Sequence, residues 1–227
     1  MEAVIKIGGS LSEKPQVLKT LGVELSSLAK KHRFVVVPGG GRFADAVRIM
    51  DAQFQLPAVI SHRMAILAMD QFGLLLSQVI PESKTSCSLK TAKEIGSGGQ
   101  TAIMLPSKTL FASDPFKPSW DVTSDSIAAY ISVKLKADKA IFVTDVDGVF
   151  TSDPKTDSSA RLISSLSVES LSHFARRTSV DKFLPLFLAE NSLDCYVVNG
   201  EFPERLAAVL SGRSAIATRI LPVTMHQ

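Results

Sequence analysis

Residues 120–154 read WDVTSDSIAAYISVKLKADKAIFVTDVDGVFTSDP, and this stretch decides the fold. Polar residues at 123–125 precede apolar residues at helical spacing, which predicts a helix with one buried face. The run AIFV at 140–143 is typical of a strand covered on both faces, and the loop TDVDG follows it. Acidic residues thus occur at the helix start and just beyond the strand end. Because ligands bind at the carboxyl ends of strands in open α/β sheets, we expect an active-site region here.

The same order of a strand followed by a glycine cluster occurs twice nearer the N-terminus. The strand predicted at 3–7 ends at GGS, and the strand predicted at 34–37 ends at PGGG. This alternation predicts an α/β fold, a three-layer αβα sandwich with a mainly parallel central sheet. We expect one domain over residues 1–227, with a divide near residue 120. The remaining predicted helices are 15–32, 42–51, 58–80, 167–175, 181–191 and 203–210, the remaining strands are 194–198 and 215–220, and short elements are expected at 86–89 and 102–105.

The composition is that of an ordinary globular protein. Hydrophobic residues make up 45% and charged residues 21% of the chain, and the formal charge of +3 is too small to indicate a nucleic-acid partner. The N-terminus does not resemble a secretory signal, and the apolar region at 65–80 is expected to be too short to span a bilayer. We therefore expect a cytoplasmic protein with no membrane partner. Cys87 and Cys195 lack metal-type spacing, so buried free thiols are expected.

The first motif, KIGGS, places Lys6 in an apolar strand directly before Gly8, Gly9 and Ser10. A lysine beside two glycines puts a point charge next to backbone N–H groups that can closely approach phosphate oxygens. The alternative is a strand-to-helix turn that needs glycine only for backbone freedom. The position of the lysine between two isoleucines favours the functional interpretation.

The second motif, PGGGRFADAVR, contains the consecutive glycines Gly39, Gly40 and Gly41. Each costs roughly 0.5–1 kcal/mol relative to alanine in a regular element, and a close backbone approach to a ligand would explain that cost. The spacing matches neither the P-loop nor the GxGxxG dinucleotide fingerprint. The motif alone indicates a ligand loop of unspecified kind.

The third motif is the stretch quoted first. Ser124 or Asp125 is by default a helix N-cap, and Asp147 with Gly148 is by default a tight turn. An EF-hand is excluded because the loop pattern and its final glutamate are missing. These carboxylates become informative when the three motifs are considered together.

In this order, the three motifs resemble the amino acid kinase superfamily, which includes acetylglutamate, aspartate, carbamate, uridylate and isopentenyl phosphate kinases. The resemblance covers nearly the whole chain. It implies the amino acid kinase fold, with an acceptor-binding half at about 1–119, a nucleotide-binding half at about 120–227, and homo-oligomerisation. It also implies phosphoryl transfer from ATP, with Mg²⁺ carried by the nucleotide and no separate protein metal site. Such transfer depends on positioning and charge compensation, so the absence of an obvious general base is no objection.

The resemblance also implies residue roles. Lys6 would neutralise the transferring phosphoryl group, and Asp125 would orient the catalytic lysines. Phosphate would be bound by Gly8, Gly9 and Ser10, and the nucleotide by Thr144, Asp145, Asp147, Gly148, Val149, Phe150 and Lys155, with Asp153 and Pro154 nearby. Many relatives carry a second catalytic lysine after a glycine-rich loop, but RRTSVDKFLP at 176–185 lacks those glycines. Lys182 is therefore either that lysine or a solvated residue at a helix start.

Several stretches resemble one branch of the superfamily, the kinases of methanofuran biosynthesis that act on [5-(aminomethyl)furan-3-yl]methyl phosphate. They are SHRMAILAMDQFG at 61–73, MLPSK at 104–108, SWDVTSDS at 119–126, TSVDKFLP at 178–185 and YVVNGEFPERL at 196–206. This implies an acceptor phosphate monoester that carries a primary amine and is converted to a diphosphate. The implied acceptor site comprises Gly39, Gly40, Gly41, Arg42, His62, Arg63, Asp70 and Asp181.

Within that site, His62 and Arg63 would meet the phosphate, and Asp70 or Asp181 would pair with the ammonium. Each has an ordinary alternative, a helix-start residue for His62 and a hydrogen-bonded helix residue for Asp70. A carboxylate on a long apolar helix costs a few kcal/mol unless it is paired, so Asp70 needs a partner from the ligand or from the protein.

Other functions remain open from the sequence. The acceptor is alternatively UMP, isopentenyl phosphate, or a carboxylate such as glutamate or acetylglutamate. A protein of this fold can also bind nucleotides or oxyanions without catalysis, or act as a regulatory subunit. The presence of both Lys6 and Asp125 favours catalysis, because binding alone would not require the pair.

Overall fold

The computed structural model describes residues 1–154, 156–172 and 179–222, and its centre is an eight-stranded sheet. The strand order is β3-β4-β2-β1-β5-β7-β8-β6, and every neighbouring pair is parallel except β7 and β8. The predicted mainly parallel sheet is thus confirmed. The strands are β1 Ala3–Ile7, β2 Phe34–Pro38, β3 Lys84–Ser86, β4 Ala102–Met104, β5 Lys139–Thr144, β6 Ser165–Ser167, β7 Asp194–Asn199 and β8 Thr218–Leu221.

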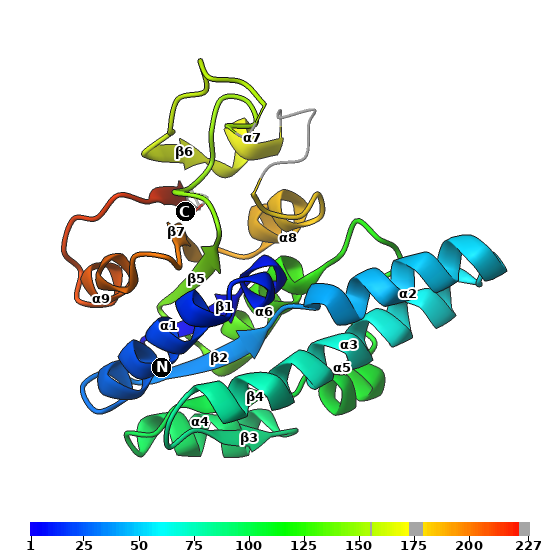
Figure 1. Cartoon of the computed structure of the whole chain (residues 1–227), viewed down its shortest axis with the longest axis horizontal. Helices are drawn as coiled ribbons and strands as arrows, with labels where there is room; N and C mark the ends of the chain where they lie inside the picture. The colour runs from blue at the N-terminus through cyan, green and yellow to red at the C-terminus, as the bar shows by residue number, and fades with distance from the viewer. Residues whose placement is uncertain (155, 173–178, 223–227) are drawn as a thin grey trace.

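Helices cover both faces of this sheet (Figure 1). Residues of α1, α9 and the C-terminal part of α3 pack on one face, and residues of α4, α6, α7 and α8 pack on the other. The three-layer αβα sandwich is therefore confirmed. The helices are η1 Gly9–Glu13, α1 Pro15–Ala29, α2 Gly41–Phe54, α3 Ala58–Val79, α4 Leu89–Ser97, α5 Ser107–Ser113, α6 Ser124–Leu135, α7 Val168–Ser172, α8 Leu184–Glu190 and α9 Pro203–Leu210.

The alternation of side chains along β1 determines the face of the sheet to which Lys6, its one charged residue, points. Ile5 and Ile7 belong to the core beneath α1, whereas Val4 belongs to the core beneath α6. Since side chains alternate along a strand, Lys6 points to the same face as Val4. In register, Lys6 lies between Val37 of β2 and Phe142 of β5, in the middle of the sheet.

Some elements differ from the sequence prediction. The helices α4 and α5 were not predicted as helices, and the short element expected at 86–89 instead covers the end of β3 and the start of α4. The helix expected from residue 181 begins at Leu184, and the last strand is Thr218–Leu221 and not 215–220. The helix expected at 167–175 is described only as Val168–Ser172, and residues 173–175 lie outside the described part. Both cysteines are free, but Cys87 is exposed, so its expected burial was wrong.

The apolar region near residues 65–80 was expected to be too short to span a membrane, and this expectation was also wrong, because the region belongs to a longer helix. The helix α3 has 22 residues and is long and apolar enough by composition to cross a bilayer. It nevertheless contacts α1, α2, α5 and β2, as a helix of a folded core does (Figure 1). Length alone therefore does not identify a membrane segment here.

Candidate active site

The glycine clusters that follow β1 and β2 meet at the carboxyl edge of the sheet. A Cβ atom built on Gly9 would lie 2.2 Å from the backbone nitrogen of Gly41, so the two loops touch through bare backbone. Gly41 also has a φ of 53°, a conformation that glycine adopts without strain. A Cβ on Gly8 would lie 2.8 Å from the Val143 carbonyl oxygen, so the close approach of β5 excludes a side chain at this position. Bare backbone N–H groups of this kind can approach phosphate oxygens closely.

The centre of the site is a buried ion pair between Lys6 and Asp125. The Lys6 Nζ lies 2.9 Å from Oδ1 of Asp125, and the two residues are only 7% and 5% exposed. Burial raises the pKa of Asp125 above its ordinary value, and the charge of Lys6 opposes that rise. Within the described part of the chain, Oδ1 accepts no hydrogen bond of good geometry, although Lys6 is close. The Asp125 carboxylate is thus held by the Lys6 charge at Oδ1 and by the Asp181 N–H at Oδ2.

The carboxylate of Asp181 organises the start of α6. Its Oδ2 accepts hydrogen bonds from the backbone N–H groups of Thr123 and Ser126, both at 2.9 Å, and from the Thr123 hydroxyl at 3.0 Å. Its Oδ1 accepts from the Ser126 hydroxyl at 2.5 Å and from the Leu184 N–H at 2.8 Å. Its own N–H donates to Asp125 Oδ2 at 3.1 Å. The cap of α6 is thus supplied from a distant segment, and not by Ser124 or Asp125 as the local sequence predicts.

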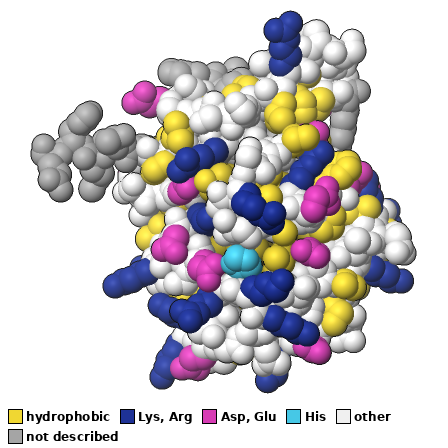
Figure 2. Space-filling model, turned by 90° about the vertical axis from the view of Figure 1, so that its left-hand side faces the viewer, with side chains coloured by type: hydrophobic (Ala, Val, Ile, Leu, Met, Phe, Trp, Pro, Cys, Tyr) yellow, Lys and Arg dark blue, Asp and Glu magenta, His cyan; other side chains and the backbone are white. Residues whose placement is uncertain are grey.

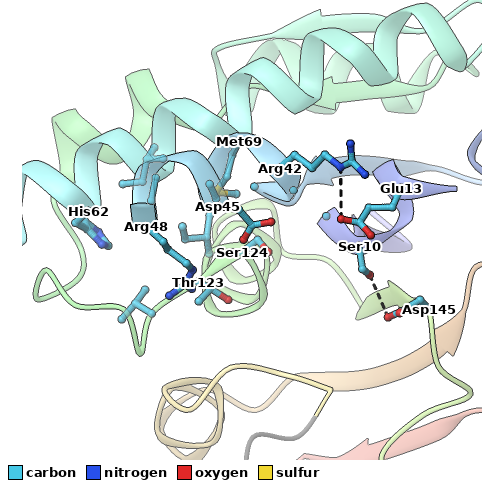
Figure 3. A pocket seen from close by; sticks show the side chains of 18 of the residues that line it. Ser10, Glu13, Arg42, Asp45, Arg48, His62, Met69, Thr123, Ser124 and Asp145 are labelled. Atoms are coloured by element: carbon cyan, nitrogen blue, oxygen red, sulfur yellow. Dashed lines mark hydrogen bonds and ion pairs between the residues drawn. The ribbon is translucent and has the colours of Figure 1, made fainter. Parts of the chain in front are cut away.

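Two cavities lie on either side of the glycine cradle. One, of about 400 Å³, contains Lys6, Gly8, Asp125 and Thr144 and also reaches Asp181 and Lys182. The other, of about 560 Å³, lies between α2, α3 and the start of α6 (Figure 3). The residues that line both cavities are Gly9, Ser10, Arg48 and Thr123. A group placed at this junction would contact both cavities.

The loop after β5 is tied to neighbouring strands. Asp145 accepts a hydrogen bond from the Ser10 hydroxyl at 3.1 Å (Figure 3). Asp147 accepts from Asn199 at 2.9 Å and from Arg205 at 2.6 Å. Partial burial raises the pKa of Asp147, but these two hydrogen bonds and the Arg205 charge outweigh it and leave the pKa low.

The rest of this loop runs toward the C-terminal strand. The Val149 N–H donates to the Thr218 hydroxyl at 2.8 Å, and the Gly148 carbonyl accepts from the Ser179 hydroxyl at 3.0 Å. Phe150 forms an isolated antiparallel β-bridge with Leu162. Lys155 lies outside the described residues.

The residues predicted for the acceptor are only partly brought together. Gly40, Gly41, Arg42 and His62 line the larger cavity, and Arg42 forms an ion pair with Glu13 at 3.4 Å. Gly39 lies behind them, against Gly9 and Ile7.

Two further residues of that prediction have protein partners elsewhere. The guanidinium of Arg63 lies over the ring of Phe111, 5.5 Å from its centroid. Both carboxylate oxygens of Asp70 accept hydrogen bonds from Ser107, one from its N–H at 3.2 Å and one from its hydroxyl. Ser107 begins α5, so Asp70 provides an acceptor at that helix start, which favours the structural alternative for this residue. A role of Asp70 or Arg63 toward the acceptor remains a prediction.

Sequence reasoning missed several residues that line the larger cavity. Asp45 and Arg48 come from α2, and Ile66 and Met69 come from α3. Helical spacing would have found the first two, because positions 41, 45 and 48 share one face of a helix that starts at the glycine cluster. The Trp120 ring lies under the Arg48 guanidinium at 4.0 Å and donates a hydrogen bond to Asp51 at 2.6 Å, contacts between distant segments that no local pattern indicates.

The partly buried His62 gives the structure a pH dependence. Burial lowers the pKa of His62 below its ordinary value of 6.5, despite a hydrogen bond with the Ser119 backbone and the nearby charge of Asp114. The unfolded chain then binds more protons, so the free energy of unfolding should rise with pH between the lowered pKa and 6.5. We expect His62→Gln to flatten this rise in urea unfolding measured across that interval. Parallel pH profiles for both proteins would contradict the assignment.

The fold and the site define a class. A mainly parallel αβα sheet with a buried lysine–aspartate pair beside two touching glycine loops is the framework of a phosphotransferase. The chain belongs to the amino acid kinase family, whose sequence profile matches residues 1–199.

Known proteins similar to this chain are consistent with that family. The [5-(aminomethyl)furan-3-yl]methyl phosphate kinase of Methanocaldococcus jannaschii is 35% identical over 97% of this chain and 98% of its own length. The uridylate kinase of Archaeoglobus fulgidus is 25% identical over 94% of this chain and 97% of its own. A crystal structure of uridylate kinase from Archaeoglobus fulgidus superposes with a TM-score of 0.76 over 97% of this chain and 100% of that chain. The predicted family, fold and phosphotransferase class are thus confirmed.

Proposed function

We propose that the protein is an ATP-dependent kinase that transfers the γ-phosphoryl group to a small phosphate monoester and forms a diphosphate. The acceptor we propose is [5-(aminomethyl)furan-3-yl]methyl phosphate, the compound in the name of the relative that is 35% identical. The observation that supports the reaction best is the Lys6–Asp125 pair, which lines one cavity and lies beside the junction with the other. An acceptor phosphate at that junction would face a donor phosphate held in front of Lys6.

In this proposal, the chain positions phosphates and compensates their charge. Lys6 would contact the transferring phosphoryl group, and the N–H groups of Gly8 and Gly9 with the Ser10 hydroxyl would bind its oxygens. Asp125 would hold Lys6 in place. Mg²⁺ would arrive with ATP and supply further charge compensation for the phosphates. The acceptor oxygen of a phosphate monoester is already an anion, so no proton transfer to a protein carboxylate is required. Lys182 lines the same cavity and pairs with Asp121 at 3.4 Å, and we assign it no catalytic role.

In this proposal, each half of the chain would bind one of the two substrates. Residues at about 120–227 would bind the nucleotide through Thr144, Asp145 and the loop 147–150. Hydrogen bonds hold this segment in position at the end of β5. Residues at about 1–119 would bind the acceptor in the larger cavity, whose volume of about 560 Å³ is within the range of small-molecule sites.

UMP is the second candidate acceptor, because uridylate kinases also match almost the whole chain. A steady-state ADP-release assay with Mg²⁺–ATP separates the candidates. The acceptors to compare are the aminomethylfuran phosphate, UMP, isopentenyl phosphate, acetylglutamate, glutamate and carbamate. We expect kcat/KM for the aminomethylfuran phosphate to exceed the others by at least about tenfold, a difference of about 1.4 kcal/mol. A preference for UMP would support the second candidate. No ADP release above background with any of the six acceptors would contradict the proposed reaction.

We propose a cytoplasmic homo-oligomer without nucleic-acid or membrane partners. Acidic and basic side chains are interspersed on the face shown in Figure 2, in keeping with the small net charge of +3.

Apolar side chains on α2 and α3 are exposed and form a candidate subunit interface: Ile49, Met50, Phe54, Val59, Ile60, Leu67, Leu74 and Leu75. Sedimentation at micromolar concentration should show a dimer or larger species that Leu74→Glu dissociates, and a wild-type monomer would exclude this interface.

A further inference from the structure

A group of contacts around Trp120 ties α2 and α3 to the segment that leads into α6. The ring N–H of Trp120 donates a hydrogen bond to Oδ2 of Asp51 at 2.6 Å, and the buried Ser61 hydroxyl donates to Oδ1 of the same carboxylate at 2.7 Å. The hydrogen bond from Trp120, followed by that from Ser61, holds the pKa of Asp51 below its ordinary value of 3.8. The indole ring is therefore fixed at its polar edge by a charged carboxylate near the end of α2.

The guanidinium of Arg48 lies over this fixed ring. Its central carbon is 4.0 Å from the centroid of the Trp120 ring, within the range of a cation–π contact. Arg48 and Asp51 are three residues apart in α2, so they share one face of that helix. A guanidinium that is already held against a ring loses little conformational freedom when it binds a ligand. Arg48 is therefore preorganised for binding.

Arg48 is also placed at the junction of the two cavities. Among the described residues that line both, it is the only charged one. In Figure 3 its side chain extends from α2 toward Thr123, at the start of α6. The smaller cavity contains Lys6 as well, whereas the larger cavity, which we assign to the acceptor, is lined by Arg48 and not by Lys6. Arg48 thus connects the acceptor cavity with the space in front of Lys6.

The carboxylates near this junction have other partners or are exposed to water. Asp51 accepts hydrogen bonds from Trp120 and a serine, and Asp125 is paired with Lys6. Asp45, three residues before Arg48, is exposed, so water and salt screen its charge. A guanidinium carries five N–H donors in a planar fork, a number that allows it to contact a protein group and a phosphate together.

We propose that Arg48 binds the phosphate group of the acceptor at the junction of the cavities, and that Trp120 and Asp51 are positioning residues that hold Arg48 there. This inference rests on the proposed function, because it assigns a residue to the acceptor of that reaction. The guanidinium fork would bind two oxygens of the acceptor phosphate, and the third would face the γ-phosphoryl group at Lys6. That third oxygen forms the new P–O bond as the bond between the γ-phosphorus and the ADP oxygen breaks.

Steady-state kinetics with Arg48→Gln test the phosphate contact. Because hydrogen bonds between charged groups are lost, KM for the aminomethylfuran phosphate (the amine ester) should rise about 10- to 100-fold, whereas KM for ATP should change by less than about threefold. The hydroxymethyl analogue, with a hydroxyl group in place of the amine, should be affected by the same factor, since Arg48 would contact the phosphate that both esters share. Arg48→Lys keeps the charge but not the fork and should have an intermediate effect.

The matched control removes an arginine far from the site. Arg33 is exposed and directly precedes β2, at the edge of the sheet opposite to the glycine loops. Arg33→Gln should leave both KM values within about twofold of the wild type, because an exposed charge contributes little.

Variants at Trp120 test the positioning role. Trp120→Leu removes the ring beneath Arg48 and should raise KM for the amine ester about three- to tenfold, the loss expected for a cation–π contact. Trp120→Phe retains an aromatic ring and should restore KM to within about twofold, although its ring cannot donate to Asp51. KM for ATP should change little in either variant. Equal effects of leucine and phenylalanine, or a matching rise in KM for ATP, would contradict the positioning role.

Binding of the amine ester without ATP separates failure of this inference from failure of the proposed function. Calorimetry gives the affinity, and the fluorescence of Trp120, the single tryptophan of the chain, should change in step because the phosphate binds the cation over its ring. Binding that Arg48→Gln weakens about 10- to 100-fold supports the assignment, even if the ester is not phosphorylated.

Two further results would overturn the assignment. Turnover of the amine ester with unchanged KM and unchanged affinity in Arg48→Gln would remove Arg48 from the acceptor site and leave the proposed function intact. A rise in KM for ATP with unchanged affinity for the ester would place Arg48 at the donor phosphates instead.

Discussion

Replacement of Lys6 by methionine should lower kcat by about 10²- to 10³-fold, the range seen when one preorganised charge-stabilising donor is removed from an active site. Methionine has nearly the same length and keeps the apolar packing of the strand, but it carries no charge. The developing charge on the transferring phosphoryl group would then lose its buried counter-charge. KM for ATP should change little, because the nucleotide contacts proposed after β5 remain.

The fold should survive this replacement. Without Lys6, burial and the charge of Asp181 raise the pKa of Asp125, and only the smaller effect of the hydrogen bond from the Asp181 N–H lowers it, so we expect the carboxyl group to be neutral. Circular dichroism and the midpoint of thermal unfolding check this directly. Lys19→Met removes an exposed lysine from α1 and is the matched control, with kcat expected to remain within about twofold because exposed charges contribute little. ATP consumption that is unchanged in Lys6→Met would contradict the proposed role.

Asp181→Ala should reduce the free energy of unfolding by about 2–4 kcal/mol, the second large effect that we expect. Its carboxylate accepts five hydrogen bonds that join the starts of α6 and α8. Each hydrogen bond to a charged group contributes about 1.5–3 kcal/mol, but bonds to one carboxylate are not additive and water replaces some of them. Chemical denaturation measures the loss. Asp121→Ala, two residues before Thr123 in sequence, removes an exposed carboxylate whose partner is Lys182 and should cost less than about 1 kcal/mol.

The acceptor dependence of Asp181 variants distinguishes this structural role from ammonium binding. Asp181→Asn should lower kcat for the amine ester and its hydroxymethyl analogue by the same factor, because displacement of α6 moves Asp125 irrespective of the acceptor. A KM increase confined to the amine ester, with normal stability, would restore the interpretation that the sequence alone suggested for Asp181.

The architecture could be predicted from the sequence because its signals are local. Residues 140–143 are a continuous apolar run, residues 3–7 are apolar except for Lys6, and each stretch is followed by glycine or acidic residues at the ligand-binding edge. The proximity of Lys6 and Asp125, 119 positions apart, follows once both are placed at that edge. Their ion pair at 2.9 Å agrees with the role that the family resemblance implies for them.

The partners of the polar residues could not be predicted in the same way. Asp70 and Asp181 look alike in the sequence, as acidic residues beside apolar stretches that need a partner. The structure gives one of them Ser107 and the other the start of α6, contacts across 37 and 55–58 positions. Asp45 and Arg48 follow the glycine cluster at helical spacing, but the packing of α2 against α3 is needed to show that this helix face borders a cavity.

Phosphorus NMR of the product tests the central claim most directly, because it shows which atom receives the phosphoryl group. With Mg²⁺–ATP and the aminomethylfuran phosphate, the account predicts a new pair of mutually coupled resonances from a P–O–P diphosphate, at the expense of the monoester signal and in step with ADP. In Lys6→Met the pair should form at least about 10²-fold more slowly. A phosphoramidate at the amine, or inorganic phosphate with unchanged monoester, would contradict the account.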